Sequence, residues 1–248
     1  MTKRSNNRPL QALISPVRGD EEPLRQHRAM QIAALFAAAL FMENLDSTII
    51  VTALPQMARS SSTDAVGLNI GVTAYTLTLA VVIPIGGWMT DRFGARRVFA
   101  TAIAIFTGAS VLGGLSQRLW SFTARRVLQG AGGAMMTPVG RLVMLRATDK
   151  RDLVRLISYV ALSGLAAPVL GPPVGGAITT YLGWRWIFFL NLPLGLIGIW
   201  YARALISDER AASVPRFDLS GFLLCGSACV SLITGSNCWT GRRRRGRR

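Results

Sequence analysis

The chain has 248 residues, of which half are hydrophobic and 16% are charged, and it carries 28 Lys and Arg against 12 Asp and Glu for a formal net charge of +16. Its apolar residues come in blocks of about twenty, the length that crosses a bilayer, instead of the stripes of an amphipathic helix. This pattern excludes an ordinary soluble domain and predicts an all-α membrane protein.

We expect six membrane spans and a weaker seventh. In chain order they are Met30–Leu54, Val66–Met89, Val98–Leu115, Ser121–Leu145, Leu153–Tyr181, Trp184–Leu205 and the weaker Phe217–Gly235. They divide the chain into a polar, basic arm at 1–28, a six-helix bundle at 29–206, a loop with the seventh apolar segment at 207–235 and an arginine-rich tail at 236–248. Ala29–Phe41 would also suit a cleaved signal peptide, but the apolar stretch continues to Leu54 and favours a span.

Basic residues alternate between the loops. They fill the arm and the loops after the second, fourth and sixth spans, whereas the loops after the first, third and fifth hold only Arg59, Arg118 and Arg185. This positive-inside pattern predicts a multi-pass protein of the cell (inner) membrane with a cytoplasmic N-terminus. It also argues against nucleic acid as a partner, because a phosphate-binding surface would not follow membrane topology.

The sequence carries no signal for a metal or for catalysis. His27 lies in the basic arm with no Cys or His near it, and Cys225, Cys229 and Cys238 lack metal-ligand or redox spacing. No phosphate loop or nucleophile elbow occurs. We therefore expect no metal, no cofactor and no enzyme activity.

The sequence contains an internal repeat, in which Gly86–Phe99 aligns with Gly175–Phe188. The identical pairs are the two leading glycines of each segment, Thr90 with Thr179, Gly94 with Gly183, Arg96 with Arg185 and Phe99 with Phe188. Each unit is three helices long, so the second unit must be inverted in the membrane. Inverted repeats of this kind build many secondary transporters, with the substrate site between the units. A chance match of short glycine-rich turns is the alternative.

Four segments carry a resemblance to a known family. They are Leu45–Pro55, Gly87–Arg97, Arg126–Gly133 and Gly171–Gly176, and they are followed by Gly183–Trp186 and Asn191–Pro193. In this order and spacing they resemble motifs of the major facilitator superfamily, and within it the fourteen-helix drug:proton antiporters of the EmrB/QacA type. The resemblance covers residues 29–235 and departs from the family pattern at Thr52, Ala95 and Ala167. A full-length member is longer, so the resemblance implies an N-terminal half.

Three charged residues inside the predicted spans need an explanation, because a charge in a helix in lipid costs several kcal/mol. Glu43 and Asp46 lie on one face of the first span, where each discourages ionisation of the other. We expect Asp46 to carry a proton, with Glu43 as the second candidate, and the resemblance implies that Arg126 of the fourth span assists proton exchange. The alternatives are purely structural partners for the acids and an arginine that reaches the membrane surface.

Asp91 and Arg92 form a turn between the second and third spans, where Gly94 permits a positive φ. The resemblance implies that this turn is a conformational latch made by Gly87, Asp91, Arg92, Gly94 and Arg96. A solvated turn that merely follows the charge rule is the alternative.

Small residues recur every four positions in the fifth span, at Ala167, Gly171 and Gly175, so that a neighbouring helix can come close. Pro172 lies among them, and a proline bends a helix because it removes a backbone hydrogen bond. The resemblance assigns Ala167, Gly171, Pro172, Gly175 and Gly176 to a helix-packing antiporter motif. Without a second half, we expect these bare faces to meet lipid or a second copy.

After Gly235 the apolar pattern stops, and six arginines lie among the last seven residues. A seventh span that starts in the cytoplasm would place them outside, against the charge rule. Two interpretations stay open. Either the tail is a frameshifted or prematurely ended translation, aberrant or disordered, or the seventh segment does not cross and the arginines bind anionic lipid.

The sequence therefore predicts a six-helix bundle of two inverted three-helix repeats plus the start of a seventh helix, the N-terminal half of a transporter. The predicted function is proton-coupled efflux of hydrophobic or cationic drugs, with the proton gradient as the energy source. The expected partners are the lipid bilayer, small hydrophobic or cationic substrates, and the missing C-terminal half or a second copy. A non-transporting membrane remnant or interaction subunit, and a nutrient symporter, are the alternatives.

Overall fold

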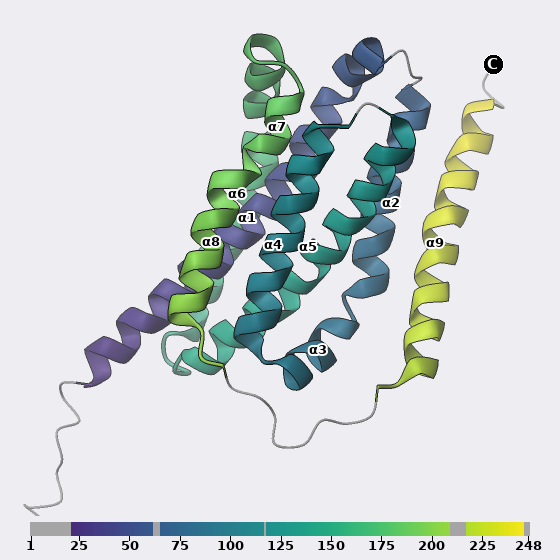
Figure 1. Cartoon of the computed structure of the whole chain (residues 1–248). Helices are drawn as coiled ribbons and strands as arrows, with labels where there is room; N and C mark the ends of the chain where they lie inside the picture. Colours follow the sequence, from purple (N-terminus) through teal and green to yellow (C-terminus); the bar gives the residue numbers. More distant parts are fainter. Residues whose placement is uncertain (1–20, 62–64, 117, 209–216, 246–248) are drawn as a thin grey trace, which may run out of the picture.

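The computed structural model describes residues 21–61, 65–116, 118–208 and 217–245, and within these ranges it contains helices and no strands. The helices are α1 (Glu21–Ser61), α2 (Ala65–Val82), α3 (Ile85–Phe93), α4 (Ala95–Gly114), α5 (Leu119–Ala147), α6 (Leu153–Tyr181), α7 (Arg185–Phe189), α8 (Asn191–Leu205) and α9 (Leu219–Arg245). Figure 1 shows α1 to α8 gathered in one bundle, with α9 at its side next to α2. The predicted all-α fold is confirmed.

Two helices extend beyond the predicted apolar spans. Helix α1 begins at Glu21, so the second part of the predicted polar arm is helical, and it continues past Pro55 to Ser61. Helix α9 continues to Arg245, so residues 236–245 are helical where we expected an aberrant or disordered tail. Glu, Gln and Arg are good helix formers, which explains how a helix continues beyond its apolar part. The frameshift stays a prediction, and residues 1–20 lie outside the described ranges.

Several described helices are long and apolar enough to cross a membrane. They are α1 over Gln26–Arg59, α4, α6, and α7 with α8 taken together. Helices α2 and α3 form a further candidate, bent by 61° at a break next to Pro84, which has no N–H to continue the ladder. Helix α5, the predicted fourth span, is not among these apolar candidates, and it packs against α1, α2 and α4. In α9 the apolar part among the fully described residues is Leu219–Leu232.

The backbone repeats itself where the sequence does. Gly94 and Gly183, which align in the two repeat segments, both have a positive φ, of 87° and 92°, at the turns that follow α3 and α6. In each copy the matched threonine donates a hydrogen bond one turn back along its helix. Thr90 Oγ1 bonds the Gly86 carbonyl at 2.7 Å, and Thr179 Oγ1 bonds the Gly175 carbonyl at 2.8 Å.

Helix packing follows the same repeat. The first unit is α1 to α4 and the second is α5 to α8, so α1 corresponds to α5 and the α2–α3 pair corresponds to α6. Helix α1 packs on α6, and α5 packs in the equivalent way on α2. The first helix of each unit thus packs against the second helix of the other unit, as expected for two interlocked three-helix repeats.

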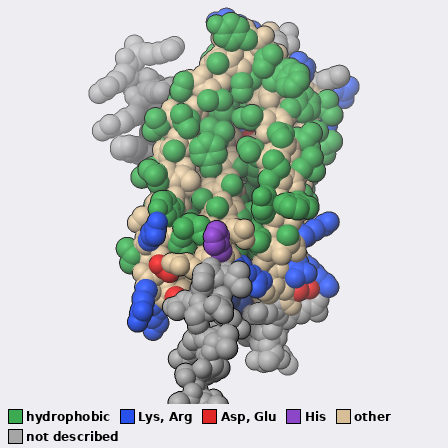
Figure 2. Space-filling view, turned by 90° about the vertical axis from the view of Figure 1, so that its left-hand side faces the viewer, with side chains coloured by type: hydrophobic (Ala, Val, Ile, Leu, Met, Phe, Trp, Pro, Cys, Tyr) green, Lys and Arg blue, Asp and Glu red, His purple; other side chains and the backbone are tan. Residues whose placement is uncertain are grey.

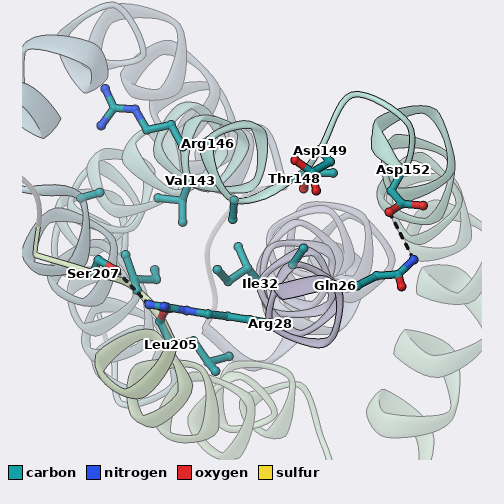
Figure 3. Close-up of a pocket in the computed structure, with 14 residues that line it drawn as sticks. Gln26, Arg28, Ile32, Val143, Arg146, Thr148, Asp149, Asp152, Leu205 and Ser207 are labelled. Carbon is teal, nitrogen blue, oxygen red and sulfur yellow. Dashed lines mark hydrogen bonds between the residues drawn. The ribbon is translucent and has the colours of Figure 1, made fainter. Parts of the chain in front are cut away.

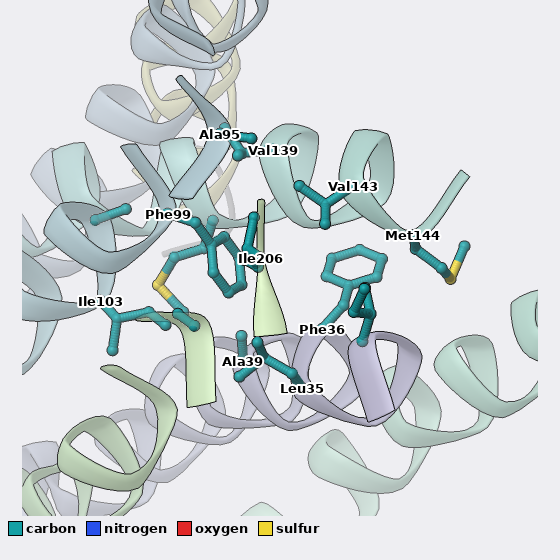
Figure 4. Close-up of a cluster of buried hydrophobic side chains, with 14 of the residues drawn as sticks. Leu35, Phe36, Ala39, Ala95, Phe99, Ile103, Val139, Val143, Met144 and Ile206 are labelled. Atoms are coloured by element: carbon teal, nitrogen blue, oxygen red, sulfur yellow. The ribbon is translucent and has the colours of Figure 1, made fainter. Parts of the chain in front are cut away.

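The hydrophobic core lies between α1, α4, α5 and the end of α8. Phe36 of α1 points toward Val143 of α5, and Phe99 lies beside the Ile206 side chain (Figure 4). The ring of Phe36 occupies the space that a side chain at position 140 would need, so this position of α5 requires glycine.

The outer surface is apolar where a bilayer would contact it. Figure 2 shows a broad hydrophobic band, with most of the basic side chains in view near one end. On α6, Leu162, Leu165 and Val169 are 65–73% exposed. Such large exposed apolar side chains suit lipid, so the chain is a multi-pass membrane protein.

Candidate functional site

Five buried polar residues from four helices meet inside the bundle, and we call them the buried polar centre. They are Asp46 of α1, Ser110 of α4, Arg126 and Gln129 of α5, and Asn191 of α8. Each is at most 2% exposed. A polar group at such depth costs free energy unless it is hydrogen-bonded, and within the described chain Arg126 Nε and Gln129 Nε2 are the atoms of this centre that lack a partner.

Asp46 lies at the middle of this centre. Arg126 Nη1 donates a charge-assisted hydrogen bond to Asp46 Oδ2 at 2.6 Å and a second bond to Gln129 Oε1 at 2.7 Å. Asn191 Nδ2 donates to the other carboxylate oxygen of Asp46 at 2.8 Å. Both oxygens of one carboxylate are therefore held, and by side chains from two other helices.

A short chain of hydrogen bonds links the centre to the turn between α7 and α8. Asn191 Nδ2 also lies 2.9 Å from Ser110 Oγ, and Ser110 Oγ donates to the Phe188 carbonyl at 3.0 Å. Because Asn191 is the first residue of α8, this chain ties the start of that helix to α1 and α4. A change in the charge or position of Asp46 would therefore alter the hydrogen bonds that hold the start of α8.

Aromatic rings surround the guanidinium of Arg126. Its Cζ atom lies 5.2 Å from the ring centroid of Tyr75, 5.6 Å from that of Phe188 and 5.9 Å from that of Phe122. Ring faces attract a cation, and their apolar bulk excludes water. The positive charge of Arg126 is compensated by Asp46 alone among the described residues, which makes the two charges strongly dependent on each other.

Glu43 lies outside the buried polar centre, although it is on the same helix as Asp46. It is partly buried, and its Oε2 accepts a hydrogen bond from Thr137 Oγ1 of α5 at 3.0 Å. The sequence placed Glu43 and Asp46 on one face; the structure gives the two acids separate partners.

The turn that we predicted to be a latch joins α3 to α4. Asp91 Oδ1 lies 3.8 Å from Arg146 Nη2 of α5, and Arg96 Nε donates to the Ile206 carbonyl at 2.6 Å. The turn is thus fastened to the ends of α5 and α8.

The remaining latch residues have other contacts. The Arg92 guanidinium lies over the Trp88 ring at 5.3 Å, and Gly94 supplies the positive φ between the two helices. Gly87 is exposed, and a Cβ there would have nothing within 4 Å.

The small residues of α6 pack against α1, so the expectation that they meet lipid or a second copy is wrong. Ala167, Gly171 and Gly175 are buried. A Cβ at Gly171 would collide with Thr48 Oγ1, and one at Gly175 with Thr52 Oγ1. The first unit itself supplies the partner helix, because α1 of one repeat packs on α6 of the other.

Two residues of the predicted packing motif lie outside this contact. Pro172 is exposed, and a Cβ at Gly176 would have nothing within 4 Å. Pro168, Pro172 and Pro173 all lie inside α6 without ending it.

A hollow of about 480 Å³ lies at the end of the bundle that carries the basic residues, away from the buried polar centre. Arg28 of α1 crosses it and donates to the Leu205 carbonyl at 3.0 Å and to Ser207 Oγ at 2.8 Å (Figure 3). On its other side Gln26 Nε2 donates to Asp152 Oδ2 at 3.2 Å. These contacts fasten the start of α1 to the end of α8 and the start of α6.

Sequence reasoning missed three members of the centre, Ser110, Gln129 and Asn191, and the neighbouring Tyr75. Gln129 and Asn191 stood in motifs that we noted without giving either residue a role, and a polar amide within an apolar stretch was the available signal. Ser110 and Tyr75 gave no such signal, because single serines and tyrosines are common in membrane helices and only their location in the fold distinguishes them.

An all-helical membrane bundle of two inverted three-helix units, with a buried ion pair between them, is the architecture of one half of a secondary transporter. The family model of the Major Facilitator Superfamily matches residues 36–234. The chain belongs to this superfamily, as its motifs predicted.

Relatives in curated proteins agree with this membership. Proteins of Escherichia coli and Shigella sonnei that carry the name "Putative multidrug resistance protein MdtD" are 40% identical to this chain over 209 residues, which cover 84% of this chain and 44% of theirs. The Escherichia fergusonii protein of the same name has the same identity and coverage. The chain therefore spans less than half the length of these relatives.

A solved structure shares the fold. The crystal structure of the human organic anion transporter MFSD10 (TETRAN) superposes with a TM-score of 0.62 at 13% sequence identity, over 79% of this chain and 53% of that one. At this identity the likeness concerns the fold alone.

Proposed function

We propose that this chain is the N-terminal six-helix bundle of a proton-coupled exporter of hydrophobic or cationic compounds. The observation that carries the proposal is the buried ion pair of Asp46 and Arg126 where α1, α5 and α8 meet. Arg126 Nη1 lies 2.6 Å from Asp46 Oδ2. The names of the 40% identical relatives support multidrug export as the wider function.

The mechanism follows from the dependence of the two charges on each other. A proton that binds Asp46 removes the charge that compensates Arg126, and an arginine cannot release its own proton. The unpaired guanidinium is then a buried charge, which costs several kcal/mol until it moves toward water or another acceptor. Movement of Arg126 releases α5 from α1, so proton binding is converted into a change in helix packing.

The same step disturbs α8. A protonated Asp46 accepts a weaker hydrogen bond from Asn191, because a charged acceptor binds more strongly than a neutral one. Asn191 in turn holds Ser110 of α4. One proton therefore acts on helices of both repeats.

Substrate movement requires a second six-helix bundle, since the site of such a transporter lies between two bundles that rock against each other. We propose the C-terminal half of a longer transporter, or a second copy of this chain, as that partner. The proton gradient supplies the energy without a cofactor. The membrane is the cell (inner) membrane, with the N-terminus in the cytoplasm.

Infrared titration of the 248-residue chain in lipid nanodiscs tests the proton site. As the pH falls, a band of protonated carboxyl groups should grow, and one component of it should be missing in Asp46→Asn and retained in Asp149→Asn, an acid at the basic end of the bundle. Asp46→Asn with Arg126→Gln removes both charges and gives the same test in a background without an unpaired charge. An unchanged band in these variants would exclude Asp46 from proton exchange.

Labelling tests the orientation. In a variant without native cysteines, Cys placed at Tyr181, which is 84% exposed at the end of α6, should react with an impermeant thiol reagent applied to intact cells. Cys placed at Arg97, with a 63% exposed side chain beside the α3–α4 turn, should react only after the cells are opened. The reverse result would invert the proposed topology.

A further inference from the structure

A groove of about 290 Å³ lies between α1 and α8, separate from the buried polar centre. Leu194 and Ile197 on its α8 side are 38% and 56% exposed, so the groove opens on the surface that a bilayer would cover. Ala38 of α1 is a small residue of its lining, and the buried Ile103 of α4 forms its floor. The small lining residue leaves room there for a bound apolar group.

The groove has the length of one leaflet of a bilayer. Along α1 it runs from Gln31 to Met42, which at 1.5 Å per residue is about 16 Å. One leaflet has half of the hydrocarbon thickness, or about 15 Å. The inner end of the groove, at Met42 and Leu194, lies one helical turn from Asp46 and Asn191. A lipid acyl chain that enters from the other end therefore reaches the middle of the bundle.

Arg28 lies at that other end, which is the basic end of the bundle. It precedes Gln31 by one turn on α1, and it donates to the Leu205 carbonyl at 3.0 Å, one turn beyond Tyr201 on α8. Its second acceptor is Ser207 Oγ at 2.8 Å, so both acceptors are neutral. None of the ion pairs among the described residues includes Arg28. The apolar groove thus ends at a positive charge that these residues leave uncompensated.

Two acids line the neighbouring hollow of 480 Å³, which Arg28 crosses. They are Asp149 and Asp152, and Asp152 accepts a hydrogen bond from Gln26. Figure 3 shows the guanidinium of Arg28 directed toward Ser207 and away from both acids. The charge of Arg28 is therefore available to a negative group on the α8 side.

We propose that the groove between α1 and α8 binds one acyl chain of an anionic phospholipid, whose phosphate pairs with Arg28. The lipid comes from the leaflet around the basic end of the bundle. Basic pockets between membrane helices are suited to anionic head groups, and the apolar lining makes dispersion contacts with the chain. The bound lipid would join α1 of the first repeat to α8 of the second. This inference does not depend on the proposed export function.

Charge argues against two other occupants. A second copy related by a two-fold axis would face this groove with its own groove, and would bring its Arg28 to the same depth in the membrane. Two like charges would then oppose each other across the interface. A zwitterionic lipid would bring a cation close to Arg28, where no described acid forms an ion pair that could compensate it.

Photolabelling of the 248-residue chain in phosphatidylcholine nanodiscs tests the site. The probe is phosphatidylglycerol with a diazirine near the end of one acyl chain, and peptide mass spectrometry locates the adducts. We expect saturable labelling around Met42 and Leu194 that unlabelled phosphatidylglycerol suppresses. Phosphatidylcholine with the same diazirine should label these residues less. Adducts spread evenly over all lipid-exposed helices, or equal labelling by the two lipids, would overturn the proposal.

Arginine variants test the recognition of the head group. Arg28→Gln should reduce labelling by phosphatidylglycerol about fivefold, the effect of one basic residue near an anionic group. Arg28→Lys keeps the charge and should retain the preference, even though its hydrogen bonds to α8 change. Arg155→Gln is the matched control, because Arg155 is an exposed arginine at the start of α6, outside the groove. An equal loss in Arg28→Gln and Arg28→Lys would mean that Arg28 only holds the helices together, and would refute its pairing with phosphate.

A volume variant tests the site of the acyl chain. Ala38→Phe fills the groove and should abolish labelling around Met42 by both lipids, whereas Ala161→Phe, at an exposed alanine of α6, should not. The arginines of 242–248 are unchanged in all these variants, so lipid bound there does not affect the comparison. Unchanged labelling in Ala38→Phe would overturn the proposal. So would a dimer, seen by analytical ultracentrifugation in detergent, that Ala38→Phe dissociates, because a second copy would then occupy the groove.

Discussion

Helix α1 makes two contacts of opposite kind. Toward α5 it presents Asp46, whose carboxylate is bonded to Arg126 at 2.6 Å inside a ring of aromatic side chains. Toward α6 it presents Thr48 and Thr52, which fill the space left by Gly171 and Gly175. The first contact depends on charge and changes when one proton binds; the second depends on shape and is insensitive to protons.

The difference indicates which helix pairs move and which stay together. A close-packed contact of small residues resists separation, because sliding it brings backbone or side-chain atoms into collision. A buried ion pair is conditionally stable, since its worth vanishes when either charge is neutralised. We therefore expect α1 and α6 to behave as one body and the α1–α5 contact to open and close.

The largest effect is expected at the charged contact. Asp46→Leu leaves Arg126 buried without a counter-charge, and should lower the free energy of unfolding by about 3–5 kcal/mol. The double variant Asp46→Leu with Arg126→Met removes both charges and should recover most of that loss. Equilibrium unfolding in mixed micelles measures both. A double variant as unstable as the single one would show that packing, and not charge, holds α1 to α5.

The shape-dependent contact should respond to volume alone. Gly175→Leu forces a side chain against Thr52 and Ile49, and should cost about 1–3 kcal/mol through overpacking. Gly176→Leu is the matched control, because a Cβ at this next position would have nothing within 4 Å. The same unfolding assay applies, and equal losses for both variants would contradict a specific α1–α6 contact.

The two repeat turns extend the comparison to the backbone. Gly183→Ala should cost about 1–2 kcal/mol because φ is +92°, even though a Cβ there meets nothing within 4 Å. Gly94→Ala should cost at least as much, because Gly94 has φ of 87° and is also buried. Thermal unfolding of both variants provides the measurement. An unchanged stability of Gly183→Ala would mean that the second turn does not require a positive φ. The two repeat turns would then differ in the backbone conformation that they need.

The smallest effect is expected at Glu43. Thr137→Val removes the hydroxyl that donates to Glu43 while keeping its shape, and should cost about 0.5 kcal/mol because the pair is only partly buried. Unfolding in mixed micelles reads the loss, with Thr76→Val, an exposed threonine on α2, as the control. A loss as large as that of Asp46→Leu would place Glu43 inside the structural ion-pair network and not beside it.

Much of the fold was predictable from the sequence. Blocks of apolar residues located the spans, and the Gly86–Phe99 repeat located the turns, because only glycine adopts the positive φ that both turns use. The helix ends were not predictable in this way. Glu21 and Arg245 lie within polar stretches, where helix propensity and not hydropathy decides how far a helix continues.

Part of the candidate site was predictable as well. Asp46 and Arg126 stood out because charges in membrane spans are costly, and the structure brings them together across 80 positions of sequence. Asn191 and Ser110 did not stand out, since an amide or a hydroxyl in a membrane helix is common. The pairing of Glu43 with Thr137 was hidden for the same reason.

The sequence by itself determined the all-helical membrane class, the inverted repeat, the family and the charged residues that need partners, because each of these depends on hydropathy, charge or glycine at fixed positions in the chain. Only the tertiary structure decided the partners. It placed the small-residue face of α6 on α1, enclosed Arg126 in aromatic rings, gave Asp46 and Glu43 different neighbours and left the Tyr75 hydroxyl without a hydrogen-bond partner in the described chain. These outcomes depend on how helices distant in sequence meet, and the distances that set hydrogen bonds and charge pairing exist only once they have met.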